Sequence, residues 1–181
     1  MTQPVPDTLS ALEDLRYPVG RFNAAAAASR AQQIDTLRQL PANLRAAVSG
    51  LDDAQLDTPY RDGGWTVRQL VHHIADSHAN AYIRFKLALT EDSPTIKPYD
   101  EAAWANLPDS RLPIDTSLAL TEAIHTRLVT LLESLSDADY QKTFRHPERG
   151  TVSLTTNLAM YDWHARHHTA HITRLRQRMG W

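Results

Sequence analysis

The stretch that decides the fold is TVRQLVHHIADSHANAYIRFKLALT, residues 66–90. Its apolar positions recur in steps of four and three, which is the seam of a helix packed in a bundle. The seam positions are Val67, Val71, Ile74, His78, Ala81, Phe85 and Ala88. Thr66 can serve as the N-cap, and Gln69 three residues later completes a capping box. The sequence therefore predicts a long amphipathic helix that begins near Thr66.

Three further segments have helical periodicity, over residues 30–48, 115–135 and 154–179. Pro41 lies inside the first of them and should kink or split it, and Gly50 is a plausible C-cap. Four amphipathic helices with little strand patterning predict an all-α four-helix bundle.

The remaining segments divide into an arm, a domain and two connections. We interpret residues 1–28 as an N-terminal arm that lies on the surface or crosses to a partner, and residues 29–181 as a single metal-binding domain. A long Pro-rich connection, residues 91–114, joins the second predicted helix (66–90) to the third (115–135) and permits a crossover topology. A loop of this length is usually functional or mobile. Its Trp104 should pack a short helical turn against the body of the domain. Residues 137–150 form a second, polar connection.

Composition excludes several classes of function. The 181 residues carry a net charge of -2 and contain no cysteine, so a nucleic-acid surface, a disulfide framework and a thiolate ligand or nucleophile are not expected. No apolar run is long enough to cross a membrane, and the first seven residues do not form a secretory signal. A soluble, cytoplasmic protein follows as the default expectation.

Histidines are the candidate functional residues of this chain. His164 and His168 lie four residues apart near the apolar seam of the last helix, and His167 with His171 forms a second such pair. A lone inward histidine usually hydrogen-bonds a facing side chain, but two crowded neutral imidazoles need a cation or a carboxylate between them. On the upstream helix His78 lies on the seam and His73 at its edge, so periodicity alone favours His78.

Four segments together resemble one known family. They are GWTVRQLVHHIADSH (64–78), YIRFKLALTED (82–92), TIKPYDE (95–101) and WHARHHTAHI (163–172). The chain resembles the DinB/YfiT-like superfamily, and its YfiT branch in particular, from about residue 17 to residue 181.

The resemblance implies a four-helix bundle, usually a homodimer, with one divalent metal ion per chain held by three histidines. The matching positions are His73, which precedes a branched apolar residue and an alanine, and His164 and His168 in the last motif. His72 is the substitute if the register within the His-His pair differs. The position of His171 is often glutamine in relatives, which argues against a ligand role. Three nitrogen ligands leave coordination positions open on the ion, and such a site suits zinc, and also nickel or iron.

The resemblance implies a metal-dependent hydrolase that activates water for attack on a small-molecule substrate. One alternative is an S-transferase that uses a low-molecular-weight thiol as cosubstrate. A second is a non-catalytic stress protein that the metal stabilises, which would need a closed, four-coordinate site.

Five further residues are candidates around the metal. Asn80 and Arg84 share the helical stripe of His73 and can contact substrate, although Arg84 can instead pair with Asp100 or Glu101. Tyr161 can orient a water or act as a bonded core aromatic. Asp76 and Asp162 can hydrogen-bond the ligand imidazoles.

Overall fold

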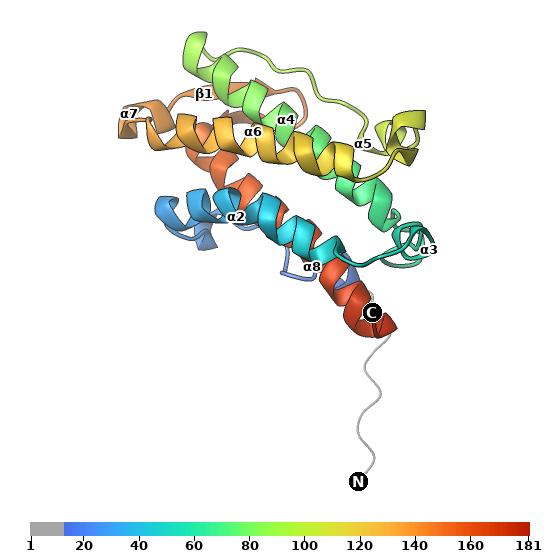
Figure 1. Cartoon of the computed structure of the whole chain (residues 1–181). Coiled ribbons are helices and arrows are strands. Elements are labelled where there is room, and N and C mark those ends of the chain that lie inside the picture. Colours follow the sequence, from blue (N-terminus) through green and yellow to red (C-terminus); the bar gives the residue numbers. More distant parts are fainter. Residues whose placement is uncertain (1–12) are drawn as a thin grey trace.

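Hydrophobic periodicity and capping side chains produce four long helices in the computed structural model, which describes residues 13–181 (Figure 1). The long helices are α2 (Arg30–Val48), α4 (Val67–Thr90), α6 (Asp115–Glu133) and α8 (Leu154–Met179). Short helical turns lie between them, namely η1 (Ala24–Ala26), α3 (Asp53–Leu56), α5 (Glu101–Trp104), η2 (Pro108–Arg111) and α7 (Asp137–Tyr140). The four-helix bundle predicted from the sequence is confirmed.

Local capping explains where these helices begin and end. The Thr66 hydroxyl accepts from the Gln69 backbone N–H, and the Gln69 side chain accepts from the Thr66 N–H, so the predicted capping box is present. Ser29 and Gln32 make the same arrangement at the start of α2. Gly50, just beyond α2, has a φ of +77°, a left-handed conformation that glycine adopts without a Cβ clash.

Each long helix packs against two others around one apolar core. α8 lies between α2 and α4, and α6 lies between the same two helices on the other side. Seam residues such as Val67, Ile74 and Phe85 of α4 are fully buried in this core. His78, which occupies the seam between Ile74 and Ala81, is therefore buried at the centre of the bundle.

Pro41 does not split α2, contrary to one of the two outcomes expected from the sequence. The helix is continuous from Arg30 to Val48 with Pro41 in its interior. A proline there lacks the N–H that would bond the carbonyl of the residue four positions earlier, which is Leu37. That carbonyl accepts a hydrogen bond from the His125 ring Nδ1 instead, at 2.6 Å.

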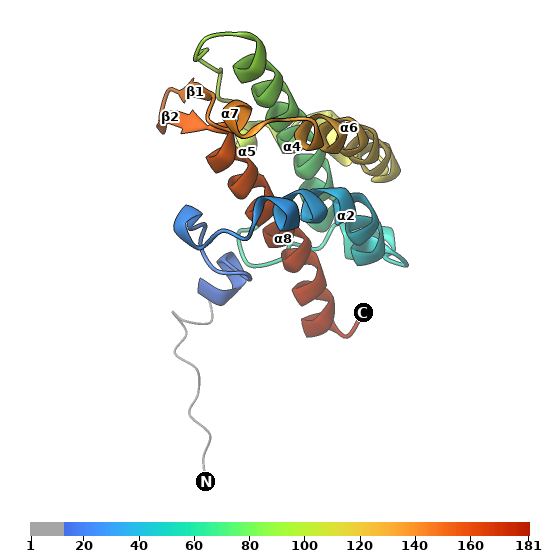
Figure 2. The ribbon, with the colours of Figure 1, turned by 90° about the vertical axis from the view of Figure 1, so that its left-hand side faces the viewer.

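A β-hairpin replaces part of the second predicted connection. Strands β1 (Thr143–His146) and β2 (Gly150–Ser153) pair antiparallel, with Phe144 opposite Val152. The Pro-rich connection runs beside β1, because backbone hydrogen bonds join Pro94 and Ile96 to Arg145. The hairpin thus lies at the end of the bundle where α4 ends and α8 begins (Figure 2).

The Pro-rich connection and the arm both fold back on the bundle. The connection contains α5 and η2, and the ring of Trp104 packs on that of Tyr99 with the centroids 4.4 Å apart, although Trp104 is 39% exposed. Residues 13–28 of the arm follow α8, where the Trp163 indole donates to the Gly20 carbonyl at 2.9 Å. Residues 1–12, which hold the rest of the arm and the first seven residues, where no secretory signal is expected, lie outside the described residues. No helix within 13–181 has the length and apolar character of a membrane span.

Candidate metal centre

Three histidines from two helices meet inside the bundle. His73 comes from α4, while His164 and His168 lie one turn apart on α8, and all three offer ring nitrogens within 4.8 Å of one another. The Nε2 atoms of His73 and His164 are 3.2 Å apart. Two metal–nitrogen bonds of about 2.1 Å at a tetrahedral angle place their nitrogens about 3.4 Å apart. The spacing therefore fits a metal ion between the two rings.

The three imidazoles are neutral at pH 7. Burial, with a smaller contribution from His167, lowers the pKa of His73 to about 4. Burial also lowers the pKa values of His164 and His168 well below the ordinary value, and the neighbouring histidines add to this effect. A neutral imidazole keeps one lone pair for a metal, whereas a protonated one has none. The cluster is thus in its metal-binding form at physiological pH.

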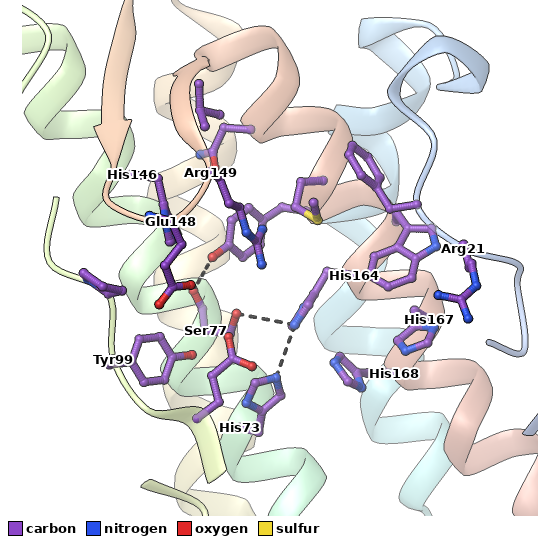
Figure 3. A pocket seen from close by; sticks show the side chains of 18 of the residues that line it. Arg21, His73, Ser77, Tyr99, His146, Glu148, Arg149, His164, His167 and His168 are labelled. Atoms are coloured by element: carbon purple, nitrogen blue, oxygen red, sulfur yellow. Dashed lines mark hydrogen bonds between the residues drawn. The ribbon is translucent and has the colours of Figure 1, made fainter. Parts of the chain in front are cut away.

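A large cavity opens beside the triad (Figure 3). Its volume is about 1020 Å³, and all three histidines line it. Figure 3 shows that its labelled side chains come from α4, α8, the hairpin, the Pro-rich connection and the arm. Trp65 packs against the His73 ring at a centroid distance of 4.6 Å. The site is therefore open to a small molecule on one side and supported by the core on the other.

One part of this cavity is lined by charged side chains of both signs, Arg84 and Arg149 together with Glu101 and Glu148. Arg84 and Arg149 both line the wall, and both lower the pKa of Glu101, which burial otherwise raises. Arg84 forms no ion pair with any carboxylate in the described chain, so the expected alternative pairing with Asp100 or Glu101 is absent there. Its guanidinium remains available to a ligand.

Asn80, the other residue predicted to contact substrate, is placed differently. Its side-chain amide donates to the Asp76 carbonyl at 2.9 Å, and it is not among the residues that line the cavity. Ser77 occupies the more useful position, four residues after His73, with its hydroxyl 3.4 Å from Nε2 of His164. Ser77 lies on the same helix face as His73, Asn80 and Arg84, so its spacing from His73 could have identified it. It was not among the candidate residues predicted from the sequence.

The other histidines of α4 have separate partners. His72 contacts the Ser117 hydroxyl at 2.7 Å and the Leu112 carbonyl at 3.0 Å, so both of its ring nitrogens point away from the triad. His78 contacts Nδ1 of His164 at 3.2 Å and Nε2 of His125 at 2.9 Å. The structure therefore brings His73 to the centre and leaves His78 as a buried, fully bonded histidine behind it.

A second histidine group on α8 shares one residue with the first. His167, His168 and His171 also offer nitrogens within 4.8 Å of one another. His171, however, does not line the cavity, and its Nε2 contacts the Arg16 carbonyl at 3.2 Å beneath the stacked ring of Tyr60. The group that spans α4 and α8 is thus the better candidate.

The carboxylates expected to bond the ligand imidazoles do not do so among residues 13–181. Asp162 is buried and pairs with Arg166 at 2.7 Å, one turn along α8. No hydrogen bond joins Asp76 to a histidine in the described chain, and burial raises its pKa. Tyr161 donates to the Ser77 carbonyl at 3.1 Å, as expected for a bonded core aromatic, and it also lines the cavity. The partner of the His164 ring is another histidine, His78, which the sequence pattern had not indicated.

Fold and site together define a class: a four-helix bundle with a three-histidine candidate metal site between two helices. A family model described as the DinB superfamily matches residues 36–172, and the chain belongs to this superfamily.

Comparisons with individual proteins agree with this assignment. A protein of Bacillus mycoides is 54% identical over 173 residues, which cover 94% of this chain and 100% of the relative. A protein of Bacillus cereus is 56% identical over 174 residues, with the same coverage. Both carry the provisional name of metal-dependent hydrolase.

Solved structures show the same fold. YfiT from Bacillus subtilis, itself provisionally described as a metal-dependent hydrolase of unusual four-helix bundle topology, superposes with a TM-score of 0.89 at 49% identity over 93% of this chain and 99% of that one. A mycothiol-dependent maleylpyruvate isomerase is similar in fold alone, with a TM-score of 0.61 and 20% identity over 78% of this chain and 60% of that one.

Proposed function

We propose that this chain is a metal-dependent hydrolase in which His73, His164 and His168 hold one divalent ion. The observation that carries the proposal is the meeting of three neutral imidazoles at the wall of a cavity of about 1020 Å³. Three protein ligands leave coordination positions open, as in catalytic rather than structural sites. Relatives at 54% and 56% identity that carry the name of metal-dependent hydrolase support it.

Zinc is the proposed ion, with nickel and iron as the alternatives. The chain has no cysteine, so its donors are nitrogen and oxygen, and neutral imidazole suits all three metals. When bound, such an ion supplies a strong nucleophile from water near neutral pH and polarises a carbonyl group. No fourth histidine or carboxylate joins the triad within residues 13–181, which favours a catalytic over a purely structural, stress-protein role.

The chain's own side chains would select and hold the substrate. Arg84 and Arg149 would bind an anionic group of a small molecule, since a guanidinium contacts a carboxylate through two parallel hydrogen bonds. Trp65 and Trp163 line the same cavity and would contact its apolar part. Binding at these places would orient the scissile bond toward the triad.

Metal content tests the ligand set. His73→Gln and His168→Gln should lose the stoichiometric metal, measured by elemental analysis of purified protein. Their matched controls, His72→Gln and His167→Gln, remove neighbouring histidines and should retain it. His171→Gln distinguishes the two histidine groups, because only the group within α8 requires that residue. Stoichiometric metal in His73→Gln would refute the proposed site.

Turnover of small esters and amides tests the reaction. The zinc-loaded protein should hydrolyse a member of the panel without added thiol, and His168→Gln should not. The second candidate, an S-transferase, is favoured by the size of the cavity, which lies at the upper end of the range for ligand pockets, and by a chain that has no thiol of its own. Turnover that requires a low-molecular-weight thiol would replace the hydrolase with this transferase, and a metal-bound protein without turnover in either assay would favour the stress protein.

The homodimer expected from the family resemblance stays a prediction. Sedimentation equilibrium of the full chain tests it directly.

A further inference from the structure

A chain of three histidines crosses the bundle behind the candidate metal centre. Nδ1 of His164 contacts Nε2 of His78 at 3.2 Å, and Nδ1 of His78 contacts Nε2 of His125 at 2.9 Å. Nδ1 of His125 then contacts the Leu37 carbonyl at 2.6 Å. These four residues belong to α8, α4, α6 and α2, so the chain touches every long helix. His78 and His125 are 0% and 2% exposed, and neither lines the cavity.

The backbone carbonyl at one end sets the direction of every hydrogen bond. A carbonyl only accepts, so Nδ1 of His125 must carry a proton. A neutral imidazole has a single N–H, so Nε2 of His125 accepts from Nδ1 of His78. By the same rule Nε2 of His78 accepts from Nδ1 of His164. The bare nitrogen that remains is Nε2 of His164, the atom that lies 3.2 Å from Nε2 of His73.

The two inner histidines are neutral, which this direction requires. Burial lowers the pKa of His125 to about 4. His78 is fully buried and its two ring nitrogens contact only other imidazoles, so no partner there would compensate a charge. No described carboxylate hydrogen-bonds either ring. Each ring therefore has one donor and one acceptor nitrogen at pH 7, and both are used.

Pro41 explains why the Leu37 carbonyl can serve as the anchor. In a regular helix this carbonyl would accept the backbone N–H of residue 41, but proline has none. The pyrrolidine ring also crowds the carbonyl of the residue four positions earlier and displaces it from the helical direction. A proline that is unfavourable for the helix itself thus leaves an acceptor for His125 inside the bundle.

We propose that His125 and His78 are positioning residues that hold the proton of His164 on Nδ1 and so keep its Nε2 free to bind the metal ion. The proposal rests on the metal centre proposed above. An outer partner of this kind fixes the ring's orientation and tautomer and strengthens the ligand, and its loss typically weakens metal binding about 10–100-fold. Neither residue touches substrate or metal.

Two substitutions at position 78 separate this role from simple packing. His78→Gln keeps an acceptor for His164 and a donor for His125, whereas His78→Leu fills the site without either. We expect the Kd for Zn²⁺, measured by competition with a chromophoric chelator, to rise about 10–100-fold in His78→Leu and to stay within about threefold in His78→Gln.

Nitrogen-15 NMR of the metal-free protein reads the tautomer directly and needs no activity. His164 should carry its proton on Nδ1 in the native chain and in His78→Gln, and should lose that preference in His78→Leu. A native His164 protonated on Nε2 would overturn the proposal, even if the Leu variant fails to fold. An unchanged Kd in a folded His78→Leu would overturn it as well. If the native chain binds no Zn²⁺, the metal centre fails, while the tautomer measurement still decides the direction of the hydrogen bonds.

Discussion

Acidification should destabilise the metal-free protein well above the pH at which carboxylates titrate. Burial lowers the pKa values of His73, His125 and His167 to about 4 and that of His171 to about 3. Nearby positive charge lowers the pKa values of His73 and His171 further, while backbone hydrogen bonds partly oppose the shift at His125 and His171. In the unfolded chain a histidine titrates near pH 6.5. The unfolded state therefore binds more protons as the pH falls through this value, so stability is fully present above pH 6.5 and is lost below it.

The size of the effect follows from the difference between the two pKa values. Between pH 7.5 and pH 5.5 each of these four histidines gains a proton in the unfolded state only, which lowers the free energy of unfolding by about 1.3 kcal/mol per residue. Together they remove about 5 kcal/mol. A domain of this kind has a total of about 5–15 kcal/mol, so the loss is a large fraction of its stability.

Urea unfolding followed by circular dichroism, with a chelator present, measures this loss. For an m-value of about 2 kcal/mol per molar, the midpoint should fall by about 2.5 M urea between the two pH values. His125→Gln provides the control, because removal of one buried histidine should reduce the pH-dependent loss by about 1.3 kcal/mol. A midpoint that stays constant down to pH 5.5 would show that the histidine core is not neutral and would refute the reasoning.

Three other changes have defined outcomes. Arg84→Met should raise KM for an anionic substrate about 10–100-fold, the value of a charge-assisted hydrogen bond, with the thermal midpoint unchanged; an unaltered KM would remove Arg84 from substrate binding. Gly64→Ala would place a Cβ 2.9 Å from Cγ and 3.1 Å from the carbonyl oxygen of Arg61, so urea unfolding should show a loss of about 1–2 kcal/mol, and equal stability would contradict the close packing. Trp163→Leu removes the indole donor to Gly20, so trypsin should cleave the arm faster than in the native chain; identical cleavage would mean that this contact does not hold the arm.

Much of the fold could be read from local sequence. The periodic segments predicted over residues 30–48 and 154–179 agree with α2 and α8, and the capping box of Thr66 and Gln69 is present at the start of α4. Caps and amphipathic stripes depend on residues within one or two turns, so the sequence contains the whole signal. The β1–β2 hairpin was missed because its short strands lie in a polar segment and are stabilised by contacts with the distant Pro-rich connection.

The candidate site was likewise predicted in part from the sequence and decided in part by helix packing. Spacing alone identified His164 and His168 as an inward pair, because four residues on one helix define one face. Periodicity alone favoured His78 as the third member, since it lies on the apolar seam of its helix, and it was the family resemblance that pointed to His73. Only the packing of α4 against α8 brings His73, at the edge of that seam, to the pair, and directs His78 to the back of the His164 ring. A seam shows which side of a helix is buried, but the angle at which two helices cross decides which of its residues meet.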